Sequence, residues 1–338
     1  MTDAIEIRPL VAEEAEKLSA CFQRCYGDTY VVAFFYDPTA IRARIVDGRL
    51  RSVIALSPDG EVVGHMALMR PHPEALTVEL GNAIVDPRYR RHGLLGRLGT
   101  VLVEECRVAG AVGYHHYQTT AHPIIQKAAV EAGGVETGVM LGYIPEGTDY
   151  LDLGRTPEHG RLAVVTVYQP IVPAPARKVF LPRRFETMLR GIYTRARLDR
   201  ETLGSLEPPV SSSTKLRSYV DVRRGLLRVE VQSVGDDLCD RIVELERLQP
   251  AEVLHVDFLL SDPAVGSAVE ELRPHGFFFC ALLPEFAATD VLRLQRLRTD
   301  SWVRPELVNP QARAILDAAL ADRRSASKGR GMSDPAKK

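Results

Sequence analysis

The sequence lacks any long apolar run, any paired cysteine motif and any excess of one charge. No stretch approaches the roughly 18 apolar residues of a membrane span, and the opening "MTDAIEIRPL" has no basic or apolar region typical of a signal peptide. The five cysteines are scattered without a Cys-x-x-Cys pair or a Cys/His ligand spacing, which favours a reducing compartment. We therefore expect a cytoplasmic protein that binds no membrane and no metal.

The charge balance excludes another class of partner. The chain has 43 Lys and Arg against 44 Asp and Glu, a formal net charge of -1 at pH 7. Such a chain has no overall field that would attract nucleic acid, so a charged ligand must be bound by a local group of residues. With 338 residues, 45% of them hydrophobic, we expect an ordinary globular protein of about two domains.

The first half of the chain shows strand and helix patterns in a mixed order. Asp59-Gly60, between two apolar runs, is a strong hairpin signal, and the other elements follow from the period of the apolar residues. We predict strands over 4–10, in the two arms of 51–70, and over 75–85, 113–120, 135–144 and 161–171, and helices over 11–26, 37–48, 93–107 and 123–133. This order predicts an α/β fold with a mixed sheet, antiparallel at first and with a parallel crossover at the helix after the fourth strand.

The second half follows a Pro-rich break, "PIVPAPARK", and repeats part of this order. Here we predict helices over 180–198, 237–248 and 263–276, a loop over 207–215, and strands over 216–222, 225–234, 252–260, 277–285 and 289–297. The last β-α-β-α-β-β run matches the end of the first half, which indicates an internal duplication. We assign residues 1–172 and 173–300 to two domains, and 301–338 to a helix and a basic tail that we expect to be disordered from Arg323.

A glycine-rich turn rich in arginine stands where a helix is about to begin, in "AIVDPRYRRHGLLGRLGTVLVEEC". The first N–H groups of a helix have no intrahelical acceptor and lie at the positive end of its dipole, which makes an anion site. Gly93 and Gly96 let a pyrophosphate approach these amides, and Arg88, Arg90, Arg91 and Arg97 add charge. The stretch is neither a Walker A loop nor a dinucleotide fingerprint.

The segment "VDPRYRRHGLLGRL" resembles the pyrophosphate signature of the GNAT superfamily, the acetyl-CoA-dependent N-acyltransferases. Arg90 and Gly93 match that signature, whereas Leu95 stands where Gly or Ala is usual and Gly96 comes one place later. The similarity covers residues 5–171 and agrees with the element order above.

The resemblance implies a GNAT fold, in two tandem copies, that binds acetyl-CoA as a co-substrate. The residues that it assigns to the cofactor are Ile84, Val85, Arg90, Arg91, His92, Gly93, Leu94, Leu95, Gly96, Arg97 and His122. It also implies an N-acetyltransferase whose acceptor is a small-molecule or peptide primary amine, and a homodimer is left open.

Acyl transfer to an amine needs a base for the ammonium proton and an acid for the departing thiolate. Period-2 alternation in "ALTVELGNAIV" places Glu79 opposite the face of Val78, Leu80 and Ile84. Glu79 also lies 14 positions before Gly93, where family members that use a strand-borne glutamate carry it. We predict Glu79 as the general base, and a solvated strand carboxylate is the alternative.

The general acid is harder to assign. Many family members carry a tyrosine four residues before the glycine that ends the last helix, and here that position is Ala129. His122, at the start of the same helix, is one substitute, with a packed or capping histidine as the alternative. Tyr117 is a second candidate for the acid, and Tyr143 a third.

Other residues invite a chemical interpretation. Tyr26, Tyr30 and Tyr36 lie where the family forms a wall of the acceptor cleft, although core packing explains the neighbouring phenylalanines equally well. His115 and His116 of "YHHY" would point to opposite faces of a strand, so we reject a metal site. We expect Cys106 to be a core residue and not a nucleophile.

The second half lacks the glycine-rich turn, because Asp236 and Asp237 occupy the helix start where phosphate would sit. We expect it to be a degenerate GNAT-like domain that packs on the first or shapes its acceptor site. The rival interpretation of the whole chain is a non-catalytic module that binds acyl-CoA or a partner protein, favoured by Ala129 and Leu95.

Overall fold

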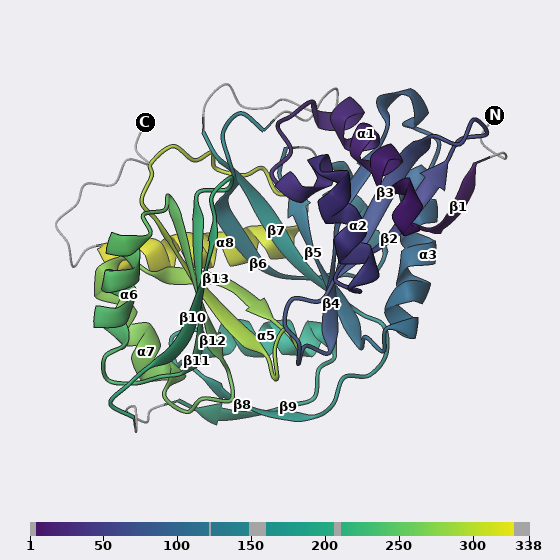
Figure 1. The fold of residues 1–338 in the computed structure, drawn as a ribbon. Coiled ribbons are helices and arrows are strands. Elements are labelled where there is room, and N and C mark those ends of the chain that lie inside the picture. The colour runs from purple at the N-terminus through teal and green to yellow at the C-terminus, as the bar shows by residue number, and fades with distance from the viewer. Residues whose placement is uncertain (1–4, 122, 149–159, 206–210, 328–338) are drawn as a thin grey trace.

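The computed structural model describes residues 5–121, 123–148, 160–205 and 211–327 (Figure 1). Its strands are β1 (Glu6–Pro9), β2 (Arg51–Leu56), β3 (Val62–Met69), β4 (Thr77–Val85), β5 (Gly113–Thr119), β6 (Val135–Ile144), β7 (Leu162–Pro170), β8 (Arg177–Leu181), β9 (Arg200–Gly204), β10 (Lys215–Asp221), β11 (Leu226–Ser233), β12 (Val253–Leu259), β13 (Phe278–Leu283) and β14 (Val291–Leu297). The α-helices are α1 (Ala15–Tyr26), α2 (Pro38–Val46), α3 (Leu94–Val108), α4 (Ile124–Glu131), α5 (Glu186–Ala196), α6 (Leu238–Leu248), α7 (Val265–Leu272) and α8 (Pro310–Ser327). None of these helices is long and apolar enough to cross a bilayer.

One mixed sheet runs through both halves of the chain, which confirms the predicted α/β class. Its strand order is β1-β2-β3-β4-β5-β7-β6-β13-β14-β12-β11-β10, while β8 and β9 form a separate parallel pair (Figure 1). The order β4-β5-β7-β6 of the first half returns as β11-β12-β14-β13 in the second, with a parallel first pair in each. Two units of the same topology therefore join edge to edge, as a duplication predicts.

The junction between the units is the contact of β6 with β13, which pair at Gly138 and Ala281. A Cβ atom on Gly138 would lie 2.5 Å from the Cys280 carbonyl oxygen, so the close approach requires glycine. The Gln295 side chain completes the bonding, because its amide donates to Val139 O at 3.0 Å and its oxygen accepts from Leu141 N at 2.9 Å.

The C-terminal helix α8 covers this junction. Its apolar residues, among them Ile315 and Leu316, belong to the same buried cluster as Val139 of β6 and Phe279 of β13. The Asp322 carboxylate also accepts a hydrogen bond from Phe279 N at 3.0 Å. The predicted disorder from Arg323 is therefore wrong up to Ser327, because the helix is anchored by packing that its own sequence does not display.

One further prediction is wrong, and one strand was not predicted. The helix predicted over 180–198 begins only at Glu186, since Phe180 and Leu181 end β8. Strand β9 was not predicted, because "RETLG" has no apolar alternation.

A β-bulge interrupts β4 near its end. Between β3 and β4, His65 pairs with Ile84 and Ala67 with Gly81, so two steps on β3 oppose three on β4, and Asn82 has a φ of 53°. The extra residue turns Ile84 into the core beneath α1, whereas Val78 and Leu80 pack against α3. The predicted alternation, which placed Ile84 with Val78 and Leu80, is wrong at this point.

Candidate functional site

Helix α3 begins with the geometry that an anion site requires. Gly93 is its N-cap, with a φ of 69°, and as a glycine it has no side chain to cap the first turn. Arg91 also has a positive φ, of 65°. A Cβ atom on Gly93 or Gly96 would meet no atom within 4 Å, so no side chain crowds the turn at these two glycines. The N–H groups of this turn are therefore accessible to a bound phosphate.

The basic residues around this turn differ in their availability. Arg91 and His92 are exposed, Arg90 Nε donates to Val85 O at 3.2 Å, and Arg97 Nη2 donates to Ile5 O at 2.9 Å. The last two bonds hold their arginines near the start of α3.

Arg88 has a different role from the one that its place in the turn predicts. Its guanidinium bonds both Asp86, at 2.9 and 3.0 Å, and Glu61, at 3.0 Å. Burial alone would raise the pKa of Asp86, but hydrogen bonds from Arg88 and Arg24 hold it at about 2. Arg88 therefore fixes the end of β4 and is neutralised by carboxylates.

Strands β4 and β5 separate beside this turn. They pair in parallel only at Thr77–Glu79 with Gly113–His115, and β4 then continues to Val85 without β5 beside it in the described chain. In the second half, β11 and β12 stay paired over Leu226–Val231. The main chain of β4 from Glu79 to Val85, including Ile84 and Val85, thus borders an opening that the second half lacks.

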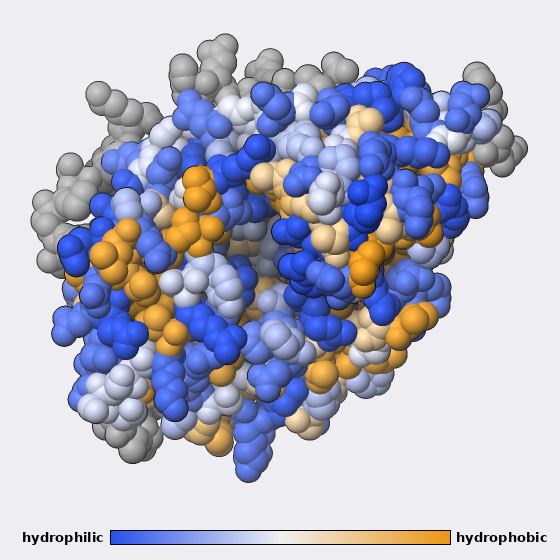
Figure 2. Space-filling view, in the orientation of Figure 1, coloured by the Kyte–Doolittle hydropathy of each residue, from blue (hydrophilic) through white to orange (hydrophobic). Residues whose placement is uncertain are grey.

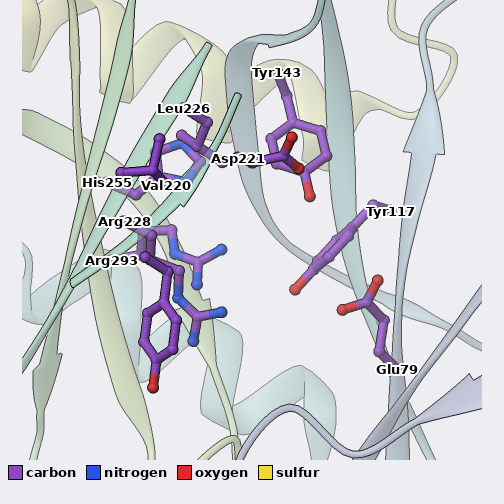
Figure 3. Close-up of a pocket in the computed structure, with 10 residues that line it drawn as sticks. Glu79, Tyr117, Tyr143, Val220, Asp221, Leu226, Arg228, His255 and Arg293 are labelled. Carbon is purple, nitrogen blue, oxygen red and sulfur yellow. The ribbon is translucent and has the colours of Figure 1, made fainter. Parts of the chain in front are cut away.

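A cavity of about 190 Å³ lies next to this opening. Its walls come from both halves of the chain, and the residues that line it are Glu79, Tyr117, Tyr143, Tyr219, Val220, Asp221, Leu226, Arg228, His255 and Arg293. In the space-filling view the surface is hollowed between the two halves, with mostly hydrophilic residues around the hollow (Figure 2). In the close-up, the guanidinium groups of Arg228 and Arg293 point across the cavity toward Glu79 and Tyr117 (Figure 3).

The curvature of the sheet creates this cavity. From β4 to β10 there are eight strand spacings, which would span about 38 Å in a flat sheet. Glu79 and Asp221 nevertheless line the same small space, so the sheet curls back on itself. Arg223, which follows β10, connects the second half to the first across this curled sheet, because its Nη1 donates to Tyr30 O at 2.7 Å.

Glu79 and Tyr117 lie on the same face of neighbouring strands. Burial raises the pKa of Glu79, and the charges of Arg224, Arg228 and Arg293 lower it in part. Burial also raises the pKa of Tyr117, with a further contribution from the Glu79 charge, so this phenol stays protonated. The Tyr117 ring meets that of Tyr143 edge on, with centroids 5.9 Å apart.

Several predicted site residues lie elsewhere. Tyr26, Tyr30 and Tyr36 pack against the core beneath α1 and are not among the residues lining the cavity. The Tyr30 hydroxyl donates to Asn82 Oδ1 at 2.8 Å, and Tyr30 N donates to the Tyr36 hydroxyl at 2.9 Å. These tyrosines therefore support the bulge of β4, and their contact with an acceptor stays a prediction. His122 lies outside the described residues.

The sequence also led to expectations for His115, His116 and Cys106. His115 Nε2 contacts Pro284 O at 2.8 Å, whereas His116 lies near Tyr114 on the other face, and burial lowers the pKa of each histidine to about 4. In the described parts of the chain, no group of three or more His, Cys, Asp or Glu is placed to hold a metal ion. Cys106 is fully buried on the inner face of α3, and burial raises the pKa of its thiol to about 12, so it is a core residue as predicted.

The corresponding turn of the second half is closed. Helix α6 follows Asp237, whose carboxylate accepts a hydrogen bond from Thr214 N at 2.6 Å. The Glu271 carboxylate accepts the first-turn N–H of Cys239 at 3.0 Å. A protein carboxylate thus accepts a first-turn N–H of α6, but it is Glu271 and not Asp236 or Asp237 as the sequence predicted, because Asp237 binds a neighbouring loop.

Sequence reasoning missed the wall that the second half contributes. Arg228, His255 and Arg293 each alternate with buried apolar residues in a strand. That alternation indicates one polar face, but solvent exposure would explain it equally well. Only the curl of the sheet turns this face toward Glu79.

No protein-family model matches the sequence, and no curated protein matches it. Similar solved structures include a GNAT superfamily phosphinothricin acetyltransferase from Sinorhizobium meliloti in complex with AcCoA, with 18% identity, 50% of this chain and 89% of that chain covered, and a TM-score of 0.39. A GCN5-related N-acetyltransferase from Kribbella flavida has 20% identity over 51% of this chain and 100% of its own, with a TM-score of 0.38. The ribosomal-protein-S18-alanine N-acetyltransferase from Escherichia coli has 18% identity over 51% of this chain and 96% of its own, with a TM-score of 0.39. At these identities and scores, the role of each residue rests on the geometry described above.

Proposed function

We propose that the protein transfers an acetyl group from acetyl-CoA to a primary amine, the reaction that the GNAT resemblance implies. The observation that carries the proposal is the conjunction of features along β4. Glu79 lines the cavity near the start of β4, the strand then continues without β5 beside it, and it leads to a helix start with glycine at the N-cap. A cytoplasmic location is part of the proposal and rests on the five free cysteines.

The residues around the turn fit the charge and shape of the co-substrate. The first-turn amides of Leu94, Leu95 and Gly96 would bind the pyrophosphate, with Arg90, Arg91, His92 and Arg97 around it. The main chain at Ile84 and Val85, which has no β5 strand paired to it, would bind the extended arm beside β4. Acetyl-CoA supplies an activated acyl carbon, and every other task falls to the chain.

Glu79 and Tyr117 divide the proton transfers between them. Glu79, with its raised pKa, accepts the proton of the acceptor ammonium, directly or through water. As the new N–C bond forms and the C–S bond breaks, the Tyr117 hydroxyl donates a proton to the departing sulfur. Tyr143 lies on the same wall and is the second candidate for this donor.

Calorimetry tests the co-substrate site. Wild-type protein should bind acetyl-CoA in the micromolar range, and Gly93→Asp should weaken binding because it places a carboxylate before the amides. Arg90→Glu should act in the same direction, each lost charge-assisted contact costing about 1.5–3 kcal/mol. Arg184→Gln, which removes a surface pair with Glu270, is the control. Absence of acetyl-CoA binding by the wild type would end the proposal.

A second candidate function is a non-catalytic module that binds acyl-CoA or a partner. It is favoured by Ala129, which is buried and apolar where many relatives of this superfamily carry the acid. An assay of free CoA release over a panel of small amines and amine-bearing peptides separates the two functions. Tight acetyl-CoA binding without CoA release from any acceptor would favour the module.

A further inference from the structure

We propose that the acceptor is a small amino carboxylate, and that Arg228 and His255 of the second half bind its carboxylate. This inference rests on the proposed function for the identity of the reacting group, and it adds the chemical class of the acceptor. It begins from the polar face that the curled sheet turns into the cavity.

The register of the strands gathers the polar residues of the second half on one face. Arg228 of β11 pairs with His255 of β12, and Asp257 of β12 pairs with Arg293 of β14. The residues between them in each strand, such as Val229, belong to the apolar cluster of the opposite face. This face therefore carries charged side chains, and those of Asp257 and Arg293 are buried.

Arg228 is oriented by protein carboxylates but keeps donors to spare. Its Nε donates to Asp257 at 2.8 Å and its Nη2 to Glu230 at 2.6 Å, and no hydrogen bond from Nη1 is found among the described residues. Asp257 also receives both Nε and Nη2 of Arg293, at 2.6 and 2.7 Å. One carboxylate thus aligns two guanidinium groups at the cavity wall, and Nη1 of Arg228 can donate to a ligand.

His255 supplies the second, independent observation. Its side chain is fully buried and lines the cavity, yet neither ring nitrogen has a hydrogen-bond partner among the described residues. The ring is stacked parallel to that of Tyr143, with centroids 6.0 Å apart, which fixes its orientation. Buried polar atoms are normally paired, so an imidazole held in this way is explained by a polar ligand in the cavity.

The two ends of the cavity have opposite chemistry. Glu79 on the first half accepts a proton from an ammonium group, whereas Arg228 and Arg293 stand on the second half (Figure 3). Asp221, also in the wall, is already bonded to Arg224, whose main-chain N–H reaches it at 3.0 Å. A second ammonium group would therefore meet guanidinium groups, and a carboxylate would meet donors.

The size of the cavity limits the acceptor further. At about 190 Å³ it is smaller than the roughly 300 Å³ at which sites for drug-sized ligands begin. A free amino acid or a similar amino carboxylate fits this space with its amine toward Glu79.

Matched acceptors test this assignment directly. We would assay L-leucine against L-leucinamide and 3-methylbutylamine, and L-lysine against its amide and cadaverine, following release of free CoA. We expect kcat/KM to favour each acid by roughly 10- to 100-fold, mainly through KM, because the analogues leave the donors of Arg228 and His255 unpaired. The α-amines of the amides are less basic and are unprotonated to a larger extent at neutral pH, so a preference for the acids over the amides cannot arise from a larger supply of free amine.

Variants locate the preference. Arg228→Gln should bring the acid-to-amide ratio of kcat/KM close to one, whereas Arg228→Lys, which keeps the charge beside Asp257, should retain part of it. A folding defect would lower the rates for acid and amide together and leave their ratio unchanged. Arg184→Gln, on the exposed surface, should alter neither rate.

Direct binding keeps the outcome independent of turnover. Calorimetry with the same acids and amides, in the presence of CoA, should detect the acids with wild-type protein and lose them with Arg228→Gln. Equal or better binding and turnover of the amines without a carboxylate would overturn this inference and leave the acetyltransferase intact. Failure to bind acetyl-CoA would instead defeat the proposed function, while the acid-binding arm would still decide the role of Arg228.

Discussion

At the scale of single residues, Glu79 combines burial with three positive charges nearby. Burial raises the pKa of its carboxyl and the arginines lower it in part, with the net shift upward. A carboxylate whose pKa is raised is a stronger base than an exposed one. The environment therefore suits a group that takes a proton from an ammonium ion.

The pH dependence of turnover follows from this shift. A base must be unprotonated to act, so kcat/KM should fall as pH decreases through the raised pKa of Glu79. Glu79→Gln should lower kcat by about 10²- to 10⁴-fold and remove that limb of the profile, while acetyl-CoA affinity stays nearly constant. Stopped assays of CoA release between pH 5 and about 9 provide the measurement. An unchanged profile would remove Glu79 from the mechanism.

The same shift predicts a change in stability. Because the folded-state pKa is raised, the favourable contribution of the protonated carboxyl is present below the unfolded pKa and is lost as pH rises through the folded pKa. Glu79→Gln should therefore raise the free energy of unfolding at pH 7, and this gain should shrink on acidification. Urea unfolding at several pH values measures it. A variant less stable than the wild type at neutral pH would contradict this reasoning.

At the scale of elements, α3 and α6 show how the same topology gives an open and a closed anion site. A Cβ on Gly96 of α3 would meet no atom within 4 Å, whereas at the α6 start Glu271 accepts a hydrogen bond from the first-turn N–H of Cys239. Ahead of α6, a Cβ on Gly235 would lie 2.9 Å from Ser213 O, so that glycine serves close packing. Both turns contain glycine, but only one leaves room for a ligand.

Gly138 offers a test of the junction between β6 and β13. Gly138→Ala would place a methyl group against the Cys280 carbonyl and Ala281, and we expect a loss of about 1–3 kcal/mol in the free energy of unfolding. Gly99→Ala is the control, because Gly99 lies inside α3 with open space around it and alanine should stabilise that helix by about 1 kcal/mol. Thermal unfolding of both variants separates a packing clash from a general effect of adding a methyl group.

The elements also show which features of the fold the sequence patterns predict and which they do not. The hairpin at Gly60, which has a φ of 76°, and the helix start at Gly93 depend on local chemistry, so the sequence predicts them. The bulge at Asn82 and the packing of α8 depend on partners distant in the chain. The polar wall at Arg228 was invisible for the same reason, since alternation reveals a face but not what it faces.

At the scale of the whole molecule, a buried ionic network within the second half holds the loop that contacts β4 of the first half. Arg200 bonds Asp290 at 2.7 Å and Glu285 at 2.7 Å, and Arg177 bonds Glu285 at 2.7 Å, with both carboxylates fully buried. The main chain of Glu285 accepts a hydrogen bond from the Thr77 hydroxyl at 2.9 Å. The loop between β13 and β14 is therefore fixed to the base of β4, the strand that carries Glu79.

This network predicts that the halves unfold together. Asp290→Asn would leave Arg200 buried with one partner fewer, and breaking a buried pair costs about 3–5 kcal/mol. We expect the fluorescence of Trp302 and the far-ultraviolet circular dichroism to change in one unfolding transition. The midpoint of this transition should lie at a lower urea concentration in the variant. Arg184→Gln, in an exposed pair, should change the free energy of unfolding by at most about 1 kcal/mol. If Asp290→Asn behaved like this surface variant, or if the two probes separated, the network would not hold the halves together. The cavity between Glu79 and Arg228 would then need another explanation for its shape.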